Sequence, residues 1–253
     1  MLTKNEIKYI QLLQDKKHRD AEGRFVAEGT KWVKELLQWQ PAWIDKVYAT
    51  RQWFEQDGES IAPAKKVEVK DHELEKISGL STPSRVVAVV HRPATGQLSF
   101  LPGKWNLVLD GIQDPGNMGS IIRIADWFGL PAIWCSPDCA DAYNPKVVQA
   151  TMGSLCRVQV LRCDIDELLA EAGPLPVFVS GMEGVSISEV KVHEGVIVIG
   201  SEGKGVRASV LEKAGIHRIT IPRIGHAESL NAAVATGIMI AGLTAAQERS
   251  RGH

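Results

Sequence analysis

Three stretches of this sequence place polar side chains and glycines directly after short apolar runs. They read DGIQDPGNMGSIIR over residues 110–123, IGSEGKGVR over residues 199–207 and ITIPRIGHAESLN over residues 219–231. Arginine can hold a phosphate or a reacting oxygen, amides and carboxylates can orient a hydroxyl group, and glycine lets a ligand approach the backbone. We therefore take the three stretches as the candidate site.

In the first stretch, Asn117 is expected to cap a helix over residues 117–128, and Gly119 allows another backbone to come close. Arg123 lies six residues after Asn117, among three isoleucines, which indicates a largely buried helix. The spacing alone leaves two interpretations of Arg123: a structural ion pair, or a group near a phosphate or a reacting oxygen.

The second stretch superficially resembles a phosphate-binding loop, but Lys204 is followed by glycine instead of the serine or threonine that a P-loop needs. Its glycines stand in the order G-x-x-G-x-G, which also differs from the dinucleotide-binding fingerprint G-x-G-x-x-G. The pattern indicates a loop whose backbone needs room around Glu202. Glu202 is either a carboxylate stabilised by a helix dipole or a site residue.

The third stretch begins with a buried strand over residues 219–221, which Pro222 ends because proline cannot donate to a strand ladder. A polar loop follows, and Ser229 is expected to cap a helix over residues 229–247. Alanine and glycine are frequent in that helix, so another backbone can pack closely against it. A second copy of the chain is the expected partner.

Strands and helices alternate around these stretches, which predicts an α/β fold. In the second part of the chain we expect strands over residues 105–109, 132–135, 158–161, 177–180, 196–199 and 219–221. Helices are expected over residues 117–128, 145–152, 165–172, 206–214 and 229–247. Strands rich in valine and isoleucine indicate a mostly parallel sheet with helices on both faces, in which ligands bind at the carboxyl ends of the strands.

Residues 1–92 are expected to form a separate small α/β domain, joined by a linker over residues 93–103 to a domain of residues 104–253. In the first domain we expect helices over residues 5–13, 24–39, 52–56 and 71–77, and strands over residues 46–49, 66–69 and 85–91. This domain is the more basic one, with 16 Lys and Arg against 14 Asp and Glu. Its cluster of Lys16, Lys17, His18 and Arg19 is either a solvated helix end or a phosphate contact.

The 253 residues carry a net charge of −1, so no global basic field indicates nucleic acid binding. No apolar run reaches the roughly 20 residues of a membrane span, and the N-terminus lacks the pattern of a signal peptide. None of the four cysteines, Cys135, Cys139, Cys156 and Cys163, has a paired C-x-x-C spacing. These features predict a cytoplasmic protein with reduced thiols and no metal site.

Together, the three stretches resemble the motifs of the SpoU (TrmH-type) family of RNA ribose 2′-O-methyltransferases, in the SPOUT superfamily. The matching residues are Asn117, Gly119 and Arg123 in N-x-G-x-x-x-R, Gly200, Glu202, Gly203 and Gly205 in G-x-E-G-x-G, and Ile221, Pro222, Ser229, Leu230 and Asn231 in I-P followed by S-L-N. The resemblance covers residues 104–248. Residues 1–92 resemble, more loosely, the L30e-like domain that precedes the catalytic domain in many relatives.

The resemblance implies a trefoil-knotted sheet and a homodimer formed by the first and last helices of the second domain. It also implies that S-adenosylmethionine binds in the knot, at Gly200, Ile221 and Leu230 with Ser180, Gly181 and Met182 nearby. The implied reaction is methyl transfer to a ribose 2′-hydroxyl of RNA. The additional L30e-like domain favours ribosomal RNA over transfer RNA.

In this reaction Arg123 would position and polarise the hydroxyl group and an RNA phosphate, since arginine is effectively never deprotonated. Glu202 would hold Arg123 or its own loop. The residues expected to orient the ribose and the arginine are Asn117, Ser229 and Asn231. The residues expected to contact RNA are Lys16, Lys17 and Arg19. The alternatives are a methyltransferase acting on transfer RNA and a non-catalytic RNA-binding assembly factor.

Overall fold

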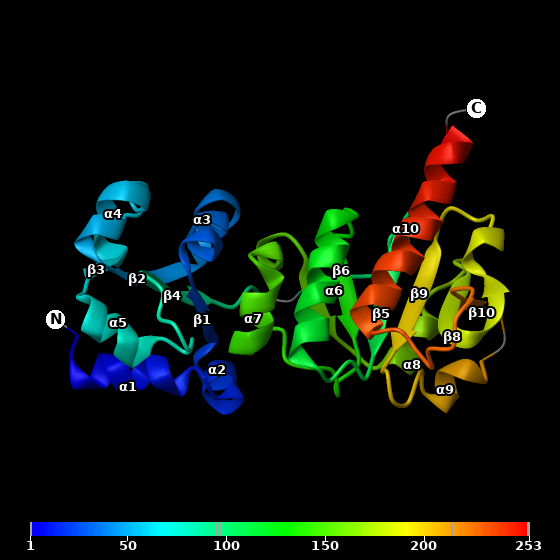
Figure 1. Ribbon diagram of the computed structural model, residues 1–253, viewed down its shortest axis with the longest axis horizontal. Coiled ribbons are helices and arrows are strands. Elements are labelled where there is room, and N and C mark those ends of the chain that lie inside the picture. Colours follow the sequence, from blue (N-terminus) through cyan, green and yellow to red (C-terminus); the bar gives the residue numbers. More distant parts are fainter. Residues whose placement is uncertain (1, 95, 97, 214, 252–253) are drawn as a thin grey trace. The chain divides into compact units, whose positions relative to one another are not determined.

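A computed structural model describes residues 2–94, 96, 98–213 and 215–251, with side chains up to residue 245. The chain folds into two compact units (Figure 1). One is formed by Met1–Ala94 with Asp141–Arg157, and the other by Thr95–Ala140 with Val158–His253. Each unit contains its own β-sheet, so each is described by itself below.

The N-terminal unit is built on a four-stranded sheet in the order β1-β4-β2-β3. Its strands are β1 (Arg24–Glu28), β2 (Ile44–Ala49), β3 (Lys66–Glu68) and β4 (Val86–His91). Strand β4 pairs antiparallel with β1 and β2, whereas β2 pairs parallel with β3. The helices of this unit are α1 (Lys4–Leu12), α2 (Lys16–Glu22), α3 (Thr30–Trp39), α4 (Arg51–Asp57), α5 (Asp71–Ile77) and α7 (Pro145–Thr151).

Strand β1 corrects the prediction of a helix that begins at Arg24. Each of its residues pairs with a residue of β4, from Arg24 opposite His91 to Glu28 opposite Val87. Alanine and glutamate favour helices, but helix propensity amounts to well under about 1 kcal/mol per residue, so pairing with a central strand outweighs it. Gly29, with a φ of 102°, then turns the chain into α3.

The C-terminal unit contains a six-stranded sheet in the order β10-β8-β9-β5-β6-β7, and all neighbouring strands are parallel. Its strands are β5 (Trp105–Asp110), β6 (Ala132–Cys135), β7 (Gln159–Arg162), β8 (Val177–Ser186), β9 (Gly195–Gly200) and β10 (Ile216–Thr220). The helices that flank this sheet are α6 (Pro115–Trp127), α8 (Ile165–Ala170), α9 (Ala208–Leu211) and α10 (Ala232–Arg251) (Figure 1). The predicted parallel sheet flanked by helices is confirmed, and the trefoil knot stays a prediction.

Several elements of this unit differ from their predicted limits; strand β8, for example, continues to Ser186 instead of ending at Ser180. Helix α9 is shorter than the helix predicted over residues 206–214, of which Ala214 lies outside the described residues. Strand β10 begins at Ile216 instead of Ile219, because it is an edge strand whose His217 and Arg218 can remain exposed. None of the described helices is long and apolar enough to cross a membrane.

Helix α7 lies in the chain between β6 and β7 of the second sheet, yet it packs within the N-terminal unit. Trp32 donates its indole N–H to the carbonyl of Val148 at 2.8 Å, and the rings of Phe25 and Tyr143 lie 5.0 Å apart between centroids. A division of the chain at residues 93–103 alone does not anticipate this packing. The N-terminal unit is completed by residues that come more than a hundred positions later in the sequence.

Candidate active site

The three stretches leave the carboxyl ends of strands β5, β9 and β10, at Asp110, Gly200 and Thr220. Because these strands are parallel members of one sheet, their carboxyl ends lie at the same edge. After β5, the chain enters α6 through Asp114, whose carboxylate accepts the backbone N–H of Asn117 at 2.7 Å. Asp114 therefore caps α6, which corrects the prediction that Asn117 does so.

Glu202 joins all three stretches through hydrogen bonds. Its Oε1 accepts from Nδ2 of Asn117, from Nδ2 of Asn231 and from the backbone N–H of Ala232, each at 2.9 Å. Nδ2 of Asn231 also donates to Oδ1 of Asn117 at 2.7 Å. The predicted convergence of the three stretches is thus present as a closed network of two amides and one carboxylate.

Asn231 has a second task at the start of α10. Its Oδ1 accepts the backbone N–H groups of Ala233 and Val234 at 3.1 and 3.2 Å, which is the geometry of an N-cap. The prediction that Ser229 caps this helix is therefore wrong, because α10 begins only at Ala232. Ser229 stays in the exposed loop before the helix and lines the pocket described next.

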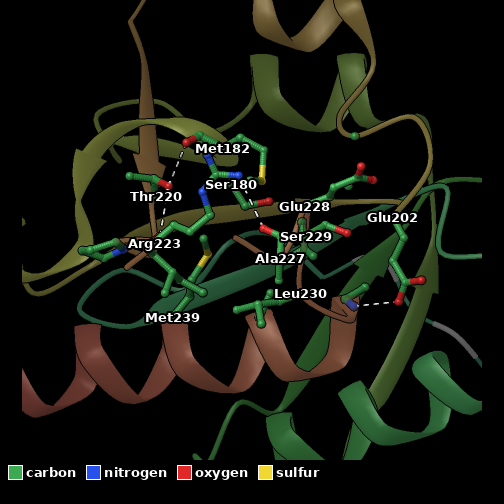
Figure 2. A pocket seen from close by; sticks show the side chains of 18 of the residues that line it. Ser180, Met182, Glu202, Thr220, Arg223, Ala227, Glu228, Ser229, Leu230 and Met239 are labelled. Atoms are coloured by element: carbon green, nitrogen blue, oxygen red, sulfur yellow. Dashed lines mark hydrogen bonds between the residues drawn. The ribbon is translucent and has the colours of Figure 1, made fainter. Parts of the chain in front are cut away.

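A pocket of about 630 Å³ opens beside this network (Figure 2). It is lined by all six residues predicted to bind the cofactor, namely Ser180, Gly181, Met182, Gly200, Ile221 and Leu230. Figure 2 shows Glu202 at one side of the pocket and Met239, from α10, at its floor. A Cβ atom on Gly200 would lie 2.2 Å from the carbonyl carbon of Gly205, so only glycine allows the backbone to fold this closely here.

Two charged residues of the pocket wall were not among the predicted catalytic or cofactor-binding residues. Arg223 and Glu228 both belong to the loop between β10 and α10 and both line the pocket. The guanidinium of Arg223 donates to the carbonyl of Ala227 at 3.4 Å, and Thr220 donates to the carbonyl of Met182 at 3.3 Å (Figure 2). The only signal in the sequence was the polar composition of this loop.

Arg123 does not line the pocket, and its side chain is exposed on α6. Six residues of an α-helix turn by about 600°, so Arg123 points roughly 120° away from Asn117 around the helix axis. The expected contact with Glu202 is absent among the described residues, because the Glu202 carboxylate binds Asn117, Asn231 and Ala232 instead.

The basic cluster of the N-terminal unit divides into two kinds of residue. Lys16 and Lys17 are exposed, and Lys16 pairs with Asp20 one turn later at 2.7 Å. Arg19 is only 1% exposed, and its guanidinium binds the Asp141 carboxylate at 2.7 Å. The structure therefore removes Arg19 from the surface on which an RNA contact was predicted.

No group of three or more His, Cys, Asp or Glu side chains is arranged to hold a metal ion in the part of the chain that the structure describes. None of the four cysteines forms a disulfide; Cys163 is partly exposed and the other three are buried.

Comparison with known proteins agrees with this geometry. Residues 104–241 match the SpoU rRNA Methylase family, and residues 4–88 match the MRM3-like substrate binding domain. The chain is 30% identical over 246 residues to the 23S rRNA (guanosine(2553)-2′-O)-methyltransferase RlmP of Bacillus subtilis, covering 93% of this chain and 94% of the relative.

Solved structures give the same result. A TrmH-family protein from Porphyromonas gingivalis superposes with a TM-score of 0.86 at 35% identity, over 96% of this chain and 98% of that one. An AdoMet-bound rRNA methyltransferase from Sinorhizobium meliloti superposes with a TM-score of 0.83 at 28% identity, over 96% and 95% of the two chains. With residues of all three motifs joined by hydrogen bonds and both units matched along nearly their whole length, this chain belongs to the SpoU rRNA methylase family of RNA methyltransferases.

Proposed function

We propose that this protein transfers a methyl group from S-adenosylmethionine to a ribose 2′-hydroxyl of ribosomal RNA. The observation that carries the proposal is the Asn117–Glu202–Asn231 network, whose Glu202 lines the 630 Å³ pocket. The Bacillus subtilis relative, which matches over both units, is a 23S rRNA 2′-O-methyltransferase, and this supports the ribose and the ribosomal substrate.

The residues of the pocket fit S-adenosylmethionine. The volume of the pocket lies in the range of about 300–1,000 Å³ that is typical of ligand sites. Ile199, Leu230 and Met239 offer apolar surface for a purine, and the carboxylates of Glu202 and Glu228 suit a positively charged sulfonium. The AdoMet-bound structure from Sinorhizobium meliloti supports the same cofactor.

When bound, the cofactor supplies an already activated methyl group, so this chain must mainly align the acceptor and engage its proton. Asn117 and Asn231 are held by Glu202 and by each other, which leaves them fixed to orient the ribose at the pocket edge. Ser229 adds a hydroxyl group on the adjacent loop. Arg123 positions the 2′-hydroxyl and a neighbouring phosphate as a permanent cation.

The proposal is tested by incubating the protein with labelled S-adenosylmethionine and RNA from a strain that lacks its gene. We expect label in one ribose of ribosomal RNA, located by mapping 2′-O-methyl groups in the deletion and parent strains. Label in transfer RNA alone would mean that transfer RNA, and not ribosomal RNA, is the substrate. Specific RNA binding without any label would favour the non-catalytic assembly factor.

A homodimer explains how Arg123 can act although it lies outside its own pocket. Trp127, one turn after Arg123 on α6, is 85% exposed, and Val234 and Ile238 expose apolar surface on α10, which packs beside α6. Such a patch on a monomer indicates a protein interface. We propose that a second copy covers these helices, which brings Arg123 to the pocket of the partner.

Replacing Trp127 with glutamate is therefore expected to convert the dimer into a monomer, because a charge would be buried in an apolar contact. Sedimentation velocity measures the change, and methyl transfer should be lost with it. The matched control is Trp39→Glu, which alters another exposed tryptophan in the N-terminal unit and should leave the dimer intact. A dimer that survives Trp127→Glu would disprove this interface.

Of the three residues predicted to contact RNA, Lys16 and Lys17 remain candidates because their side chains are exposed. The double change of both to alanine should weaken RNA binding and reduce the slope of log K against log salt by at most about 2, because each phosphate contact releases roughly one counterion. Lys76→Ala, on α5, is the control for loss of an exposed charge in the same unit. An unchanged slope in the double variant would make the pair an ordinary solvated helix surface.

A further inference from the structure

The glycine loop that carries Glu202 is fastened at both ends to a single buried residue. Asp110 is 4% exposed and pairs across the sheet with Gly200, the last residue before the loop. Its carboxylate binds Arg207, the first residue after the loop, through the backbone N–H at 2.7 Å and the side-chain Nε–H at 2.8 Å. Nη2 of Arg207 donates to the same carboxylate.

Between these two anchors the loop closes on itself. The N–H of Gly205 donates to the carbonyl of Ser201 at 2.8 Å, and the N–H of Ser201 donates back to the carbonyl of Gly205 at 3.2 Å. Only Glu202, Gly203 and Lys204 remain in the turn. The position of the Glu202 carboxylate is therefore set by where residues 200 and 207 are held, and both are held by Asp110.

We propose that Asp110 and Arg207 form a positioning pair that fixes the Glu202 carboxylate, and through it Asn117, Asn231 and the start of α10, in the arrangement used for methyl transfer. The catalytic part of this inference rests on the proposed function, whereas the structural part does not. Neither residue touches the pocket, so neither is a catalytic residue.

The chemistry of the pair is suited to this role. Oδ1 of Asp110 accepts from Nε and Nη2 of the Arg207 guanidinium, and Oδ2 accepts from the Arg207 backbone N–H. The guanidinium fork and the backbone bond together define direction as well as distance. The hydrogen bonds with Asp110 also raise the pKa of Arg207 above its usual value. A second carboxylate, Asp138, lies 3.3 Å from the same guanidinium but is largely exposed, so it contributes little.

Cutting the pair is expected to loosen the loop. In Arg207→Met, the hydrogen exchange of residues 201–206 and of the Ala232 amide, which donates to Glu202, should accelerate by about tenfold or more. Methyl transfer should fall by up to about a hundredfold, because a small misplacement of orienting groups has an effect of this size. Asp138→Asn is the matched control and should change either measurement by less than about twofold.

Because Arg207→Met leaves a buried carboxylate unpaired, it could unfold the unit. Asp110→Asn with Arg207→Gln removes both charges and keeps polar side chains, so this double variant should fold while still showing the faster exchange. Arg207→Lys keeps the charge without the fork and should lie between the wild type and Arg207→Met.

A cycle with Glu202→Gln shows whether the pair acts through Glu202. If it does, adding Arg207→Met to Glu202→Gln lowers the methyl transfer rate no further. If the two substitutions act independently, the fold-loss in rate of the double variant is the product of the two single losses. The proposal would be overturned by unchanged hydrogen exchange at residues 201–206 in both Arg207→Met and the Asp110→Asn, Arg207→Gln double variant. It would also be overturned if the rate losses of Arg207→Met and Glu202→Gln multiply. Faster exchange in a protein that methylates no RNA would support the positioning pair and contradict the proposed function alone.

Discussion

Replacing Arg123 with alanine is expected to lower the rate of methyl transfer by about two to three orders of magnitude, the usual effect of removing one group that stabilises a transition state. The affinity for S-adenosylmethionine should stay within about twofold, because Arg123 does not line the pocket. A contact made only in the transition state lowers the rate when it is removed but leaves binding of the cofactor unchanged. Single-turnover methylation and isothermal titration calorimetry measure the two quantities separately. Wild-type methylation by the variant would contradict the assignment.

The same variant can show whether Arg123 acts in its own protomer or in the partner. A mixture of Arg123→Ala and Glu202→Ala protomers contains dimers in which one pocket has Glu202 and faces an intact Arg123 of the other chain. If Arg123 acts across the dimer, an equal mixture should recover about one quarter of the wild-type activity. If it acts within its own chain, no site in the mixture is complete and activity stays absent.

Replacing Arg19 with alanine should destabilise the N-terminal unit by about 3–5 kcal/mol, the usual cost of removing one partner of a buried ion pair. The Arg19 guanidinium also donates to the carbonyls of Leu13 and Gln14 at 3.0 and 2.7 Å, so two further acceptors would lose their donor. Urea denaturation, followed by the fluorescence of the tryptophans in this unit, measures the loss.

The control for this variant is Lys16→Ala on the same helix. Lys16 forms an exposed pair with Asp20, so its removal should change the free energy of unfolding by less than about 1 kcal/mol. Should Arg19→Ala unfold like the wild type and bind RNA more weakly, the guanidinium would have to leave the interior, and the original prediction of an RNA contact would be right.

Much of the fold and the location of the site follow from the sequence alone. Apolar periodicity is a property of neighbouring residues, and valine-rich strands alternating with helices define a parallel sheet without knowledge of any long-range contact. In such a sheet, the polar stretches after Asp110, Gly200 and Thr220 must lie at one edge. The candidate site could therefore be predicted as a set of three loops.

The partner of each polar group was decided by the tertiary structure. Asp114 and Asn117 are both good capping residues, and only the fold places Glu202 opposite Asn117, so Asp114 is the one that caps α6. Ser229 was predicted to cap α10, but serine and asparagine cap helices about equally well, and the position of Glu202 selects Asn231 instead. A capping signal in a sequence identifies candidates within a few residues and does not choose between them.

For the same reason, the sequence around Arg19 and Asp110 does not show that these charged side chains are buried. Arg19 stands beside two solvated lysines, and its carboxylate partner lies 122 residues away on a segment that belongs to the N-terminal unit only in three dimensions. Asp110 ends an apolar strand, and its partner Arg207 lies 97 residues later. The sequence by itself determined which side chains are present at the strand ends, and the tertiary structure decided which of them meet, because a hydrogen bond or an ion pair depends on distance in space and not on distance along the chain.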